Sequence, residues 1–165
     1  MSSTSRSRLS RKRKAIYRVS PLEAHLGYWL RFVSNHVSHA FKMKVERQGV
    51  TVAEWVVMRA LFDEDGVKPS ELSETIGMTR GAISKLLDRL ATKELVVVRG
   101  DTLDRRAQLV TLSALGRRLV PKLAELADEN DAETFGHLTA EQRTMLLSLL
   151  RSIVDRLGLN SPPID

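Results

Sequence analysis

The hydrophobic pattern of the chain is helical from residue 21 to about residue 62. Apolar side chains recur every three or four positions, a spacing that places them on one face of a helix. Pro21 suits the first turn of a helix over 21–48, and Gly49 is expected to end it. Thr51 is expected to cap a second helix. The apolar stripe of the first helix consists of Leu22, Leu26, Trp29, Leu30, Val33, Val37 and Phe41. The second helix is expected to face inward with Trp55, Met58, Leu61 and Phe62.

Two shorter amphipathic helices follow, separated by a glycine. Ser70 is placed to cap a helix over 71–76, and Thr79 is placed to cap a helix from residue 80 to about 92. Gly77 lies between them, where a chain leaving a helix takes a left-handed conformation that costs glycine little. The pattern predicts a helix-turn-helix unit. Its inner positions are Leu72, Ile76, Ile83, Leu86, Leu87 and Leu90.

A β-hairpin is predicted immediately after this unit. Residues 96–99 form the expected first strand and residues 108–112 its return. The loop between the strands carries Asp104, Arg105 and Arg106. A hairpin with paired arginines beside a helix-turn-helix is a wing, so the predicted fold class is mainly α with a small β-wing.

The last third of the chain predicts two more helices. Ser113 is expected to cap a long one, which Pro121 should bend or locally disturb because proline removes a backbone hydrogen bond. Thr139 and Gln142 form a capping box for the final helix. The apolar stripe of that helix consists of Met145, Leu146, Leu149, Leu150, Ile153, Val154 and Leu157.

The first and last helices pose a problem of burial. Each is long and apolar on one face, and a domain this small does not easily cover every such face from one chain. Pairing with a second copy across a two-fold axis would cover both. We therefore expect 21–48 and 113–158 to form a dimerisation region around a winged helix-turn-helix over 49–112.

The outer face of the helix from residue 80 is basic, and its first turn is small. Gly81 and Ala82 leave that turn uncluttered, so it can enter the major groove of DNA. Ordinary solvated helices show the same pattern, so the face by itself is a weak signal. The side chains expected to point away from the apolar stripe are Arg80, Ser84, Lys85 and Arg89.

The positive charge of the chain is unevenly distributed. The formal net charge of the 165 residues is +6, but residues 1–20 hold seven Lys and Arg and no acid. This Ser-, Lys- and Arg-rich tail is expected to be disordered, either contacting DNA or acting as a solvated leader. Residues 78–106 hold seven basic and four acidic residues, whereas 121–165 hold four and eight. Positive potential thus gathers where DNA would dock.

The composition gives little support to an enzymatic or membrane function. The absence of cysteine excludes disulfides and thiolate catalysis, and no enzymatic constellation, cofactor motif or membrane-spanning run is present. A cytoplasmic location is therefore expected. His36 and His39 share a helix face, which leaves a metal-responsive regulator as one alternative. The other is a protein that coats nucleic acid without reading its sequence.

Three segments resemble the MarR family of bacterial regulators. They are GVTVAEWVVMRAL, PSELSETIGMTRGAISKLLDRL and DTLDRRAQLVTLSALG, within a resemblance that covers about residues 22–157. Ser113 replaces the usual threonine and preserves the helix cap. Glu94 replaces the glycine usual before the first wing strand, so a differently shaped turn is expected there.

The resemblance implies a homodimeric, sequence-specific regulator of transcription. Thr79, Arg80, Ser84, Lys85 and Arg89 would contact the major groove and phosphates of double-stranded DNA. Arg105 and Arg106 would form the wing contacts, with Asp104 shaping the loop. The implied operator is a pseudo-palindrome.

The family also implies release from DNA by a small aromatic or anionic effector. Its expected position is a crevice between the dimerisation helices and the DNA-binding region. His36, Trp55 and Arg59 are the candidate effector contacts from the first two helices. A tryptophan at helical spacing, such as Trp55, is more often a core residue than the wall of a ligand site.

Overall fold

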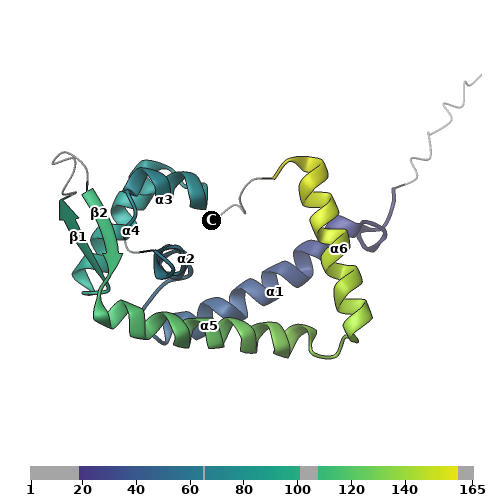
Figure 1. The fold of residues 1–165 in the computed structure, drawn as a ribbon. Coiled ribbons are helices and arrows are strands. Elements are labelled where there is room, and N and C mark those ends of the chain that lie inside the picture. The colour runs from purple at the N-terminus through teal and green to yellow at the C-terminus, as the bar shows by residue number, and fades with distance from the viewer. Residues whose placement is uncertain (1–18, 65, 101–107, 160–165) are drawn as a thin grey trace, which may run out of the picture.

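The computed structural model describes residues 19–64, 66–100 and 108–159 and shows a globular lobe carried on long helices (Figure 1). The lobe consists of α2, α3, α4 and a two-stranded sheet. The arm consists of α1, α6 and the C-terminal part of α5, which runs from the lobe alongside α1. The elements are η1 (Leu22–Ala24), α1 (Leu26–Glu46), α2 (Val52–Phe62), α3 (Pro69–Ile76), α4 (Arg80–Thr92), β1 (Val96–Gly100), β2 (Gln108–Leu112), α5 (Ala114–Phe135) and α6 (Ala140–Leu157). The predicted fold class is confirmed.

Four predicted helix caps are confirmed by their hydrogen bonds. The hydroxyl oxygens of Thr51, Thr79 and Ser113 each accept from the backbone N–H three residues on. Thr139 does the same, and the Gln142 side chain accepts from the Thr139 N–H, which completes the capping box. These bonds satisfy N–H groups that a helix start leaves without partners.

Two predicted helix starts are wrong, the first by five residues and the second by two. Pro21 precedes the short 3-10 turn η1, and the extended backbone of His25 separates that turn from α1, which begins at Leu26. Ser70 does not cap α3, because the helix already begins at Pro69. Proline suits a first helical position, since its fixed φ is helical and its missing N–H has no partner there. Glu71 then accepts from the Lys68 N–H at 3.2 Å.

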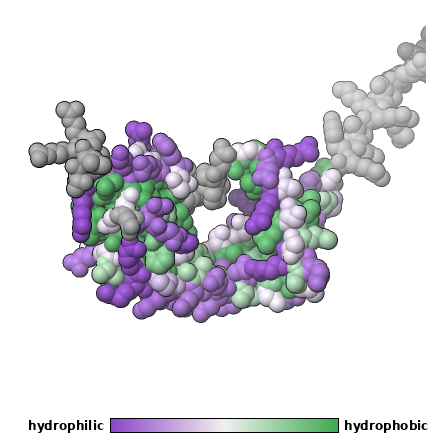
Figure 2. All heavy atoms as spheres, in the orientation of Figure 1, coloured by the Kyte–Doolittle hydropathy of each residue, from purple (hydrophilic) through white to green (hydrophobic). Residues whose placement is uncertain are grey.

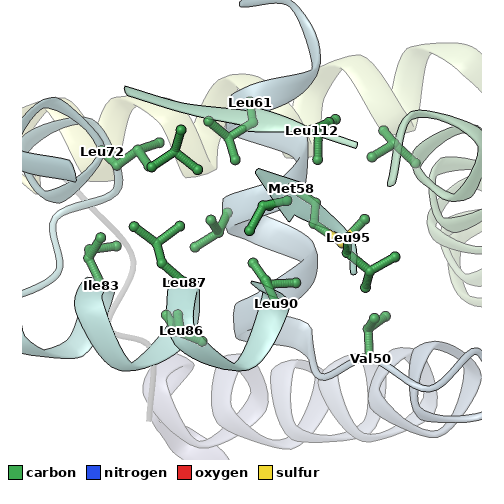
Figure 3. Packing of buried hydrophobic residues seen from close by; sticks show 14 of the residues in the cluster. Val50, Met58, Leu61, Leu72, Ile83, Leu86, Leu87, Leu90, Leu95 and Leu112 are labelled. Atoms are coloured by element: carbon green, nitrogen blue, oxygen red, sulfur yellow. The ribbon is translucent and has the colours of Figure 1, made fainter. Parts of the chain in front are cut away.

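The core of the lobe is built around α2, with α3 and α4 packed against it (Figure 3). Met58 and Leu61 are fully buried, as predicted, whereas Trp55 and Phe62 are partly buried at its edge. The apolar stripe of α4 also faces inward as predicted. The other buried contributors include Val50, Leu72, Ile83, Leu86, Leu87, Leu90, Leu95 and Leu112.

The wing is an antiparallel pair of strands that is also bonded to the chain before α3. The register pairs Val96 with Leu112 and Gly100 with Gln108. Val67 forms an isolated bridge with Val110, in which each backbone N–H donates to the other residue's carbonyl oxygen at 3.0 and 2.9 Å. The helix-turn-helix and the base of the wing are therefore joined by backbone hydrogen bonds.

The turn from α4 into β1 keeps a left-handed residue although it lacks glycine. Glu94 has φ +59°, a conformation that glycine adopts more easily. The Glu94 N–H donates to the Ala91 carbonyl and the Leu95 N–H to the Leu90 carbonyl, both at 2.9 Å, which is the Schellman pattern of a helix end. The expectation that Glu94 changes the shape of this turn is therefore wrong.

The start of α5 lies directly against this turn. The Ser113 hydroxyl donates to the Glu94 carbonyl at 2.6 Å, and the Ser113 N–H donates to the Leu95 carbonyl at 3.0 Å. A Cβ at Gly116 would collide with the Leu95 carbonyl oxygen, so glycine is required for this close approach. From there α5 continues through Pro121 without interruption of its helical span.

The arm is held together mainly by α1 and α5. The Asn130 side-chain amide donates to the Val37 carbonyl at 3.2 Å, and Lys44 donates to Glu133 at 2.8 Å. In α6, every side chain except Leu146 is exposed. Among the described residues, no helix is long and apolar enough to cross a membrane, and no three potential metal ligands lie together.

Candidate nucleic-acid interface

The turn between α3 and α4 is fixed by backbone and side-chain hydrogen bonds. Gly77 has φ +76°, as its predicted left-handed role requires, and its N–H donates to the Ser73 carbonyl at 3.0 Å. The Ser73 hydroxyl donates to the Met78 carbonyl at 2.6 Å. These contacts hold α4 at a set angle to α3, as a helix-turn-helix requires.

The start of α4 presents a polar face on top of an apolar stripe. The Thr79 hydroxyl accepts from the Ala82 N–H at 3.2 Å, which fixes the first turn. Ile83 and Leu90 are fully buried beneath it. Gly81 is exposed and Ala82 half-buried, so the first turn is free of bulk. The predicted DNA contacts brought together on the exposed side are Thr79, Arg80, Ser84 and Lys85.

Arg89, the fifth predicted contact on α4, has a partner within the protein. Its Nε lies 3.5 Å from Glu54 Oε1, although the Arg89 side chain remains 57% exposed. Glu54 is fully buried at the start of α2. Its Oε2 accepts from Lys93 Nζ at 2.8 Å and from the Thr51 N–H at 2.7 Å. A buried carboxylate thus joins both cations at the C-terminal end of α4 to α2.

The local environment keeps Glu54 ionised. Burial acts to raise the pKa of this carboxyl. Hydrogen bonds from Lys93 and from the Thr51 backbone, together with the charges of Lys93 and Arg89, outweigh that effect and lower the pKa below its ordinary value of 4.5. The carboxylate is therefore charged at neutral pH and supports the two cations.

Sequence reasoning missed the role of Glu54, although part of the signal was present. Thr51 and Glu54 form a capping box, with a threonine and a glutamate three residues apart at the start of an apolar helix. That pattern predicts only the local bond to the Thr51 N–H. Lys93 lies 39 positions further along the chain, so its pairing with Glu54 depends on the tertiary fold.

The predicted wing contacts lie outside the described residues. Asp104, Arg105 and Arg106 all fall in 101–107, between the ends of β1 and β2. The strands that flank this segment are described, and their register confirms the hairpin.

The candidate effector residues lie on α1 and α2 and have different surroundings. His36 is exposed on α1, and Trp55 packs half-buried against the core. Arg59 Nη1 donates to Asp63 at 2.6 Å, and its guanidinium lies 5.9 Å from the centre of the Phe62 ring. Among the described residues, no hydrogen bond or ring contact joins these three side chains to one another.

The fold and the exposed face of α4 define a class of protein. A helix-turn-helix with an attached β-hairpin, presenting small and basic side chains at the start of its second helix, is a DNA-binding winged helix-turn-helix.

Comparison with known proteins finds a likeness to one family of this class. A model of the MarR family matches residues 48–107. The transcriptional regulator HosA of Escherichia coli is 27% identical over 117 residues, which cover 71% of this chain and 87% of HosA. Other relatives, at 26–27% identity, are named transcriptional repressors.

Solved structures give the same result. BpsR of Bordetella bronchiseptica, whose DNA binding is regulated by 6-hydroxynicotinic acid, superposes with a TM-score of 0.72 at 27% identity, covering 84% of this chain and 99% of BpsR. A MarR mutant of Escherichia coli in complex with operator DNA gives a TM-score of 0.70 at 24% identity, with coverage of 78% and 93%. The chain is similar to the MarR family over residues 48–107, and the relatives that it matches are transcriptional regulators, not enzymes.

Proposed function

We propose that this protein is a sequence-specific repressor that binds a pseudo-palindromic operator as a homodimer and is released by a small organic effector. The observation that carries the proposal is the start of α4, where Arg80, Ser84 and Lys85 are exposed above a fully buried Ile83. A rigid helix start with short and basic side chains suits direct contacts with base edges and phosphates.

The arm supports the dimer. Apolar side chains on α1 and α6 are open to solvent, and Figure 2 shows hydrophobic residues at the surface of this part of the molecule. A contiguous apolar surface of this kind is typical of an interface. We propose that α1, α5 and α6 of two copies pack together, with residues 49–112 of each copy carried as a DNA-binding unit. The exposed apolar residues of α6 include Met145, Leu149, Leu150, Ile153, Val154 and Leu157.

Selection of genomic fragments by the purified protein tests the operator proposal. A dimer with two α4 helices should select pseudo-palindromes whose half-sites lie about 10 bp apart, or a multiple of that spacing. Ser84→Ala and Lys85→Ala should change base preference at one position per half-site, by roughly 1–3 kcal/mol. Lys42→Ala removes a comparable charge from α1 and is the matched control. Selection of sites without two-fold symmetry would contradict the proposal.

The salt dependence of DNA binding distinguishes a sequence-specific regulator from a protein that coats nucleic acid without reading its sequence. A sequence reader keeps a large ratio of operator to random-DNA affinity as salt rises, whereas a coating protein has little preference at any salt concentration.

Arg105 and Arg106 remain proposed wing contacts, shaped by Asp104, and the basic residues 1–20 remain a proposed auxiliary contact. Arg106→Ala should lower the salt slope by about 0.9 for each phosphate that the variant no longer neutralises.

Support for control by an effector comes from a structural relative. BpsR responds to 6-hydroxynicotinic acid, an aromatic acid. We propose an aromatic or anionic effector for this chain also, acting in the cytoplasm, with His36, Trp55 and Arg59 as candidate contacts. An effector releases the protein only if it binds better to a dimer whose two lobes are wrongly spaced for the operator. Derepression of a reporter placed behind a selected operator tests both the sign of regulation and the ligand.

A further inference from the structure

Three charged side chains lie together where the C-terminal half of α4 packs against the start of α2. Glu54 is fully buried, whereas Arg89 and Lys93 on α4 remain partly open to solvent. The two cations exceed the single carboxylate, so the group keeps a net positive charge. We call it the Glu54 cluster and define it by these three residues.

The two cations of the Glu54 cluster contact different carboxylate oxygens. Lys93 Nζ donates to Glu54 Oε2 and to the Gly49 carbonyl, both at 2.8 Å. Arg89 Nε lies 3.5 Å from Glu54 Oε1, a buried oxygen that accepts no hydrogen bond among the described residues. Lys93 therefore compensates the buried charge, and the positive charge in excess belongs to Arg89.

The Arg89 guanidinium is held from one side only. Arginine carries five N–H donors in a fixed planar fork, and Nε supplies one of them. In the described part of the chain, Glu54 is the only charged partner of Arg89, so the four donors on its two Nη nitrogens stay available. An arginine fork binds a phosphate through two parallel hydrogen bonds. The outer end of Arg89 therefore suits a phosphate of the DNA backbone.

Arg89 also follows Lys85 on the same side of α4. Residues four positions apart are neighbours on a helix surface, so Lys85, Arg89 and Lys93 form a row of like charges that repel each other. Glu54 lies beneath this row, offsets the repulsion and attracts Arg89 toward α2. Contacts to phosphates set the orientation of a DNA-binding helix, whereas side chains at its start read bases. A fixed phosphate contact at Arg89 would therefore orient the start of α4.

We infer that Glu54 is a positioning residue for DNA binding, which holds Arg89 by Nε so that the Nη end of the guanidinium binds a backbone phosphate. The inference rests on the proposed function, because it requires that α4 docks on DNA. An arginine that is fixed before binding loses less side-chain freedom when the complex forms. Glu54 thereby strengthens the complex, although its own charge repels phosphates.

The substitution Glu54→Gln tests the sign of this effect. Glutamine still accepts from the Thr51 N–H in a capping box, but it lacks the charge that holds Arg89. The affinity for a DNA duplex should fall roughly three- to tenfold, which is the cost of fixing one free side chain on binding. Loss of a negative charge alone would raise the affinity. An unchanged or raised affinity of Glu54→Gln would therefore overturn the inference.

Glu71→Gln is the matched control for charge. Glu71 occupies the same capping-box position in α3, accepts from the Lys68 N–H and is exposed. Removal of a negative charge from the lobe at this position should leave DNA affinity unchanged or raise it slightly. A loss equal to that of Glu54→Gln would assign the effect to the helix caps rather than to Arg89, and would also overturn the inference.

Combined substitutions separate a positioning role from a structural one. Arg89→Ala should weaken DNA binding about tenfold and lower the salt slope by about 0.9, since one phosphate contact is lost. Adding Glu54→Gln to Arg89→Ala should cost no further affinity, because the side chain that Glu54 positions is gone. Arg89→Lys should recover little of the affinity, since an ammonium group lacks the fork that contacts a carboxylate and a phosphate together. Additive losses, or wild-type affinity of Arg89→Lys, would contradict the inference.

The Nε–H signal of Arg89 in NMR spectra tests the contact in the wild-type protein and does not depend on the folding of Glu54→Gln. The signal is assigned by its loss in Arg89→Lys. In the free protein it should exchange with water more slowly than the Nε–H of Arg80, which is exposed on the same helix. It should shift when a duplex is added. Equal exchange of the two signals, or no shift with DNA, would overturn the inference.

A duplex of random sequence separates this inference from the proposed function. Phosphate contacts do not depend on sequence, so Glu54→Gln should weaken binding to an operator and to a random duplex by similar factors. If the protein selects no operator but Glu54→Gln weakens its binding to a random duplex, the proposed function fails and the inference stands. If operator binding is selective and Glu54→Gln leaves it unchanged, the inference fails and the proposed function stands. No binding to any duplex overturns both.

Discussion

The lobe and the arm use hydrophobic residues in opposite ways. In the lobe, α2 is surrounded by α3, α4, the hairpin and α5, and residues such as Met58 and Leu61 have no exposure. In the arm, α6 leaves all but one of its side chains exposed, including Leu149 and Ile153. One chain therefore buries the apolar residues of the lobe but leaves those of α6 in the arm exposed. The lobe buries its own apolar core, whereas the arm leaves an apolar surface that the proposed dimer would cover.

The largest effect is expected from a cavity in the lobe. Leu61→Ala removes a fully buried side chain and should reduce the free energy of unfolding by about 2–5 kcal/mol. Denaturant unfolding at fixed protein concentration measures this decrease. Val98→Thr, at a 41% exposed position of the same region, is the control and should change stability little. A small decrease from Leu61→Ala would show that the lobe is not a self-sufficient core.

A charge on α6 should break the proposed dimer without unfolding the lobe. Ile153→Glu places a carboxylate on the apolar stripe and should weaken dimerisation about 30-fold or more, as expected when a strongly contributing interface residue is disrupted. Sedimentation across a concentration series measures the dissociation constant. Ser148→Glu adds the same charge to another face of α6 and should leave the dimer intact. Equal behaviour of the two variants would remove α6 from the interface.

Glu54 is expected to stabilise the lobe in a pH-dependent way. Its folded pKa lies below 4.5, so its contribution is present above that pH and is lost as the pH falls through the folded value. Glu54→Gln should cost roughly 1–3 kcal/mol at neutral pH, because it weakens bonds to Lys93 and Thr51. Urea unfolding from pH 7 to pH 3 should show the gap between wild type and variant closing below 4.5. A gap that widens in acid would contradict this assignment.

The smallest effect is expected at the turn between α4 and β1. Glu94→Gly removes the cost of a left-handed conformation with a side chain and should raise stability by about 0.5–1 kcal/mol. Thermal unfolding measures the gain. Glu94→Ala retains the Cβ and should give no comparable gain, which separates backbone conformation from the loss of the carboxylate.

Local patterns predicted the local features of this molecule well. The caps at Thr51, Thr79, Ser113 and Thr139 involve contacts within three residues, so the sequence contains all their partners. Ser70 has a good capping side chain, but Pro69 before it is itself a strong start signal, and α3 begins there.

Features formed by several distant segments could not be predicted from sequence patterns. Arg89 was predicted from its place on the outer face of α4, but its pairing with buried Glu54 requires α2 to pack against α4. The bond from Lys93 Nζ to Glu54 Oε2 likewise joins residues 39 positions apart. The spacing of residues within one helix does not predict contacts between distant segments, because those contacts depend on how the helices cross.

The close contact at Gly116 couples α5 rigidly to the end of the lobe. With only a hydrogen atom between α5 and the carbonyl of Leu95, the helix and the end of the DNA-facing unit have no compliant side chain between them. A change in the direction of α5 would therefore rotate the whole lobe, because no flexible contact lies between the two. In a two-fold assembly, small changes of tilt between the long helices become large changes in the separation of the two groove-binding ends.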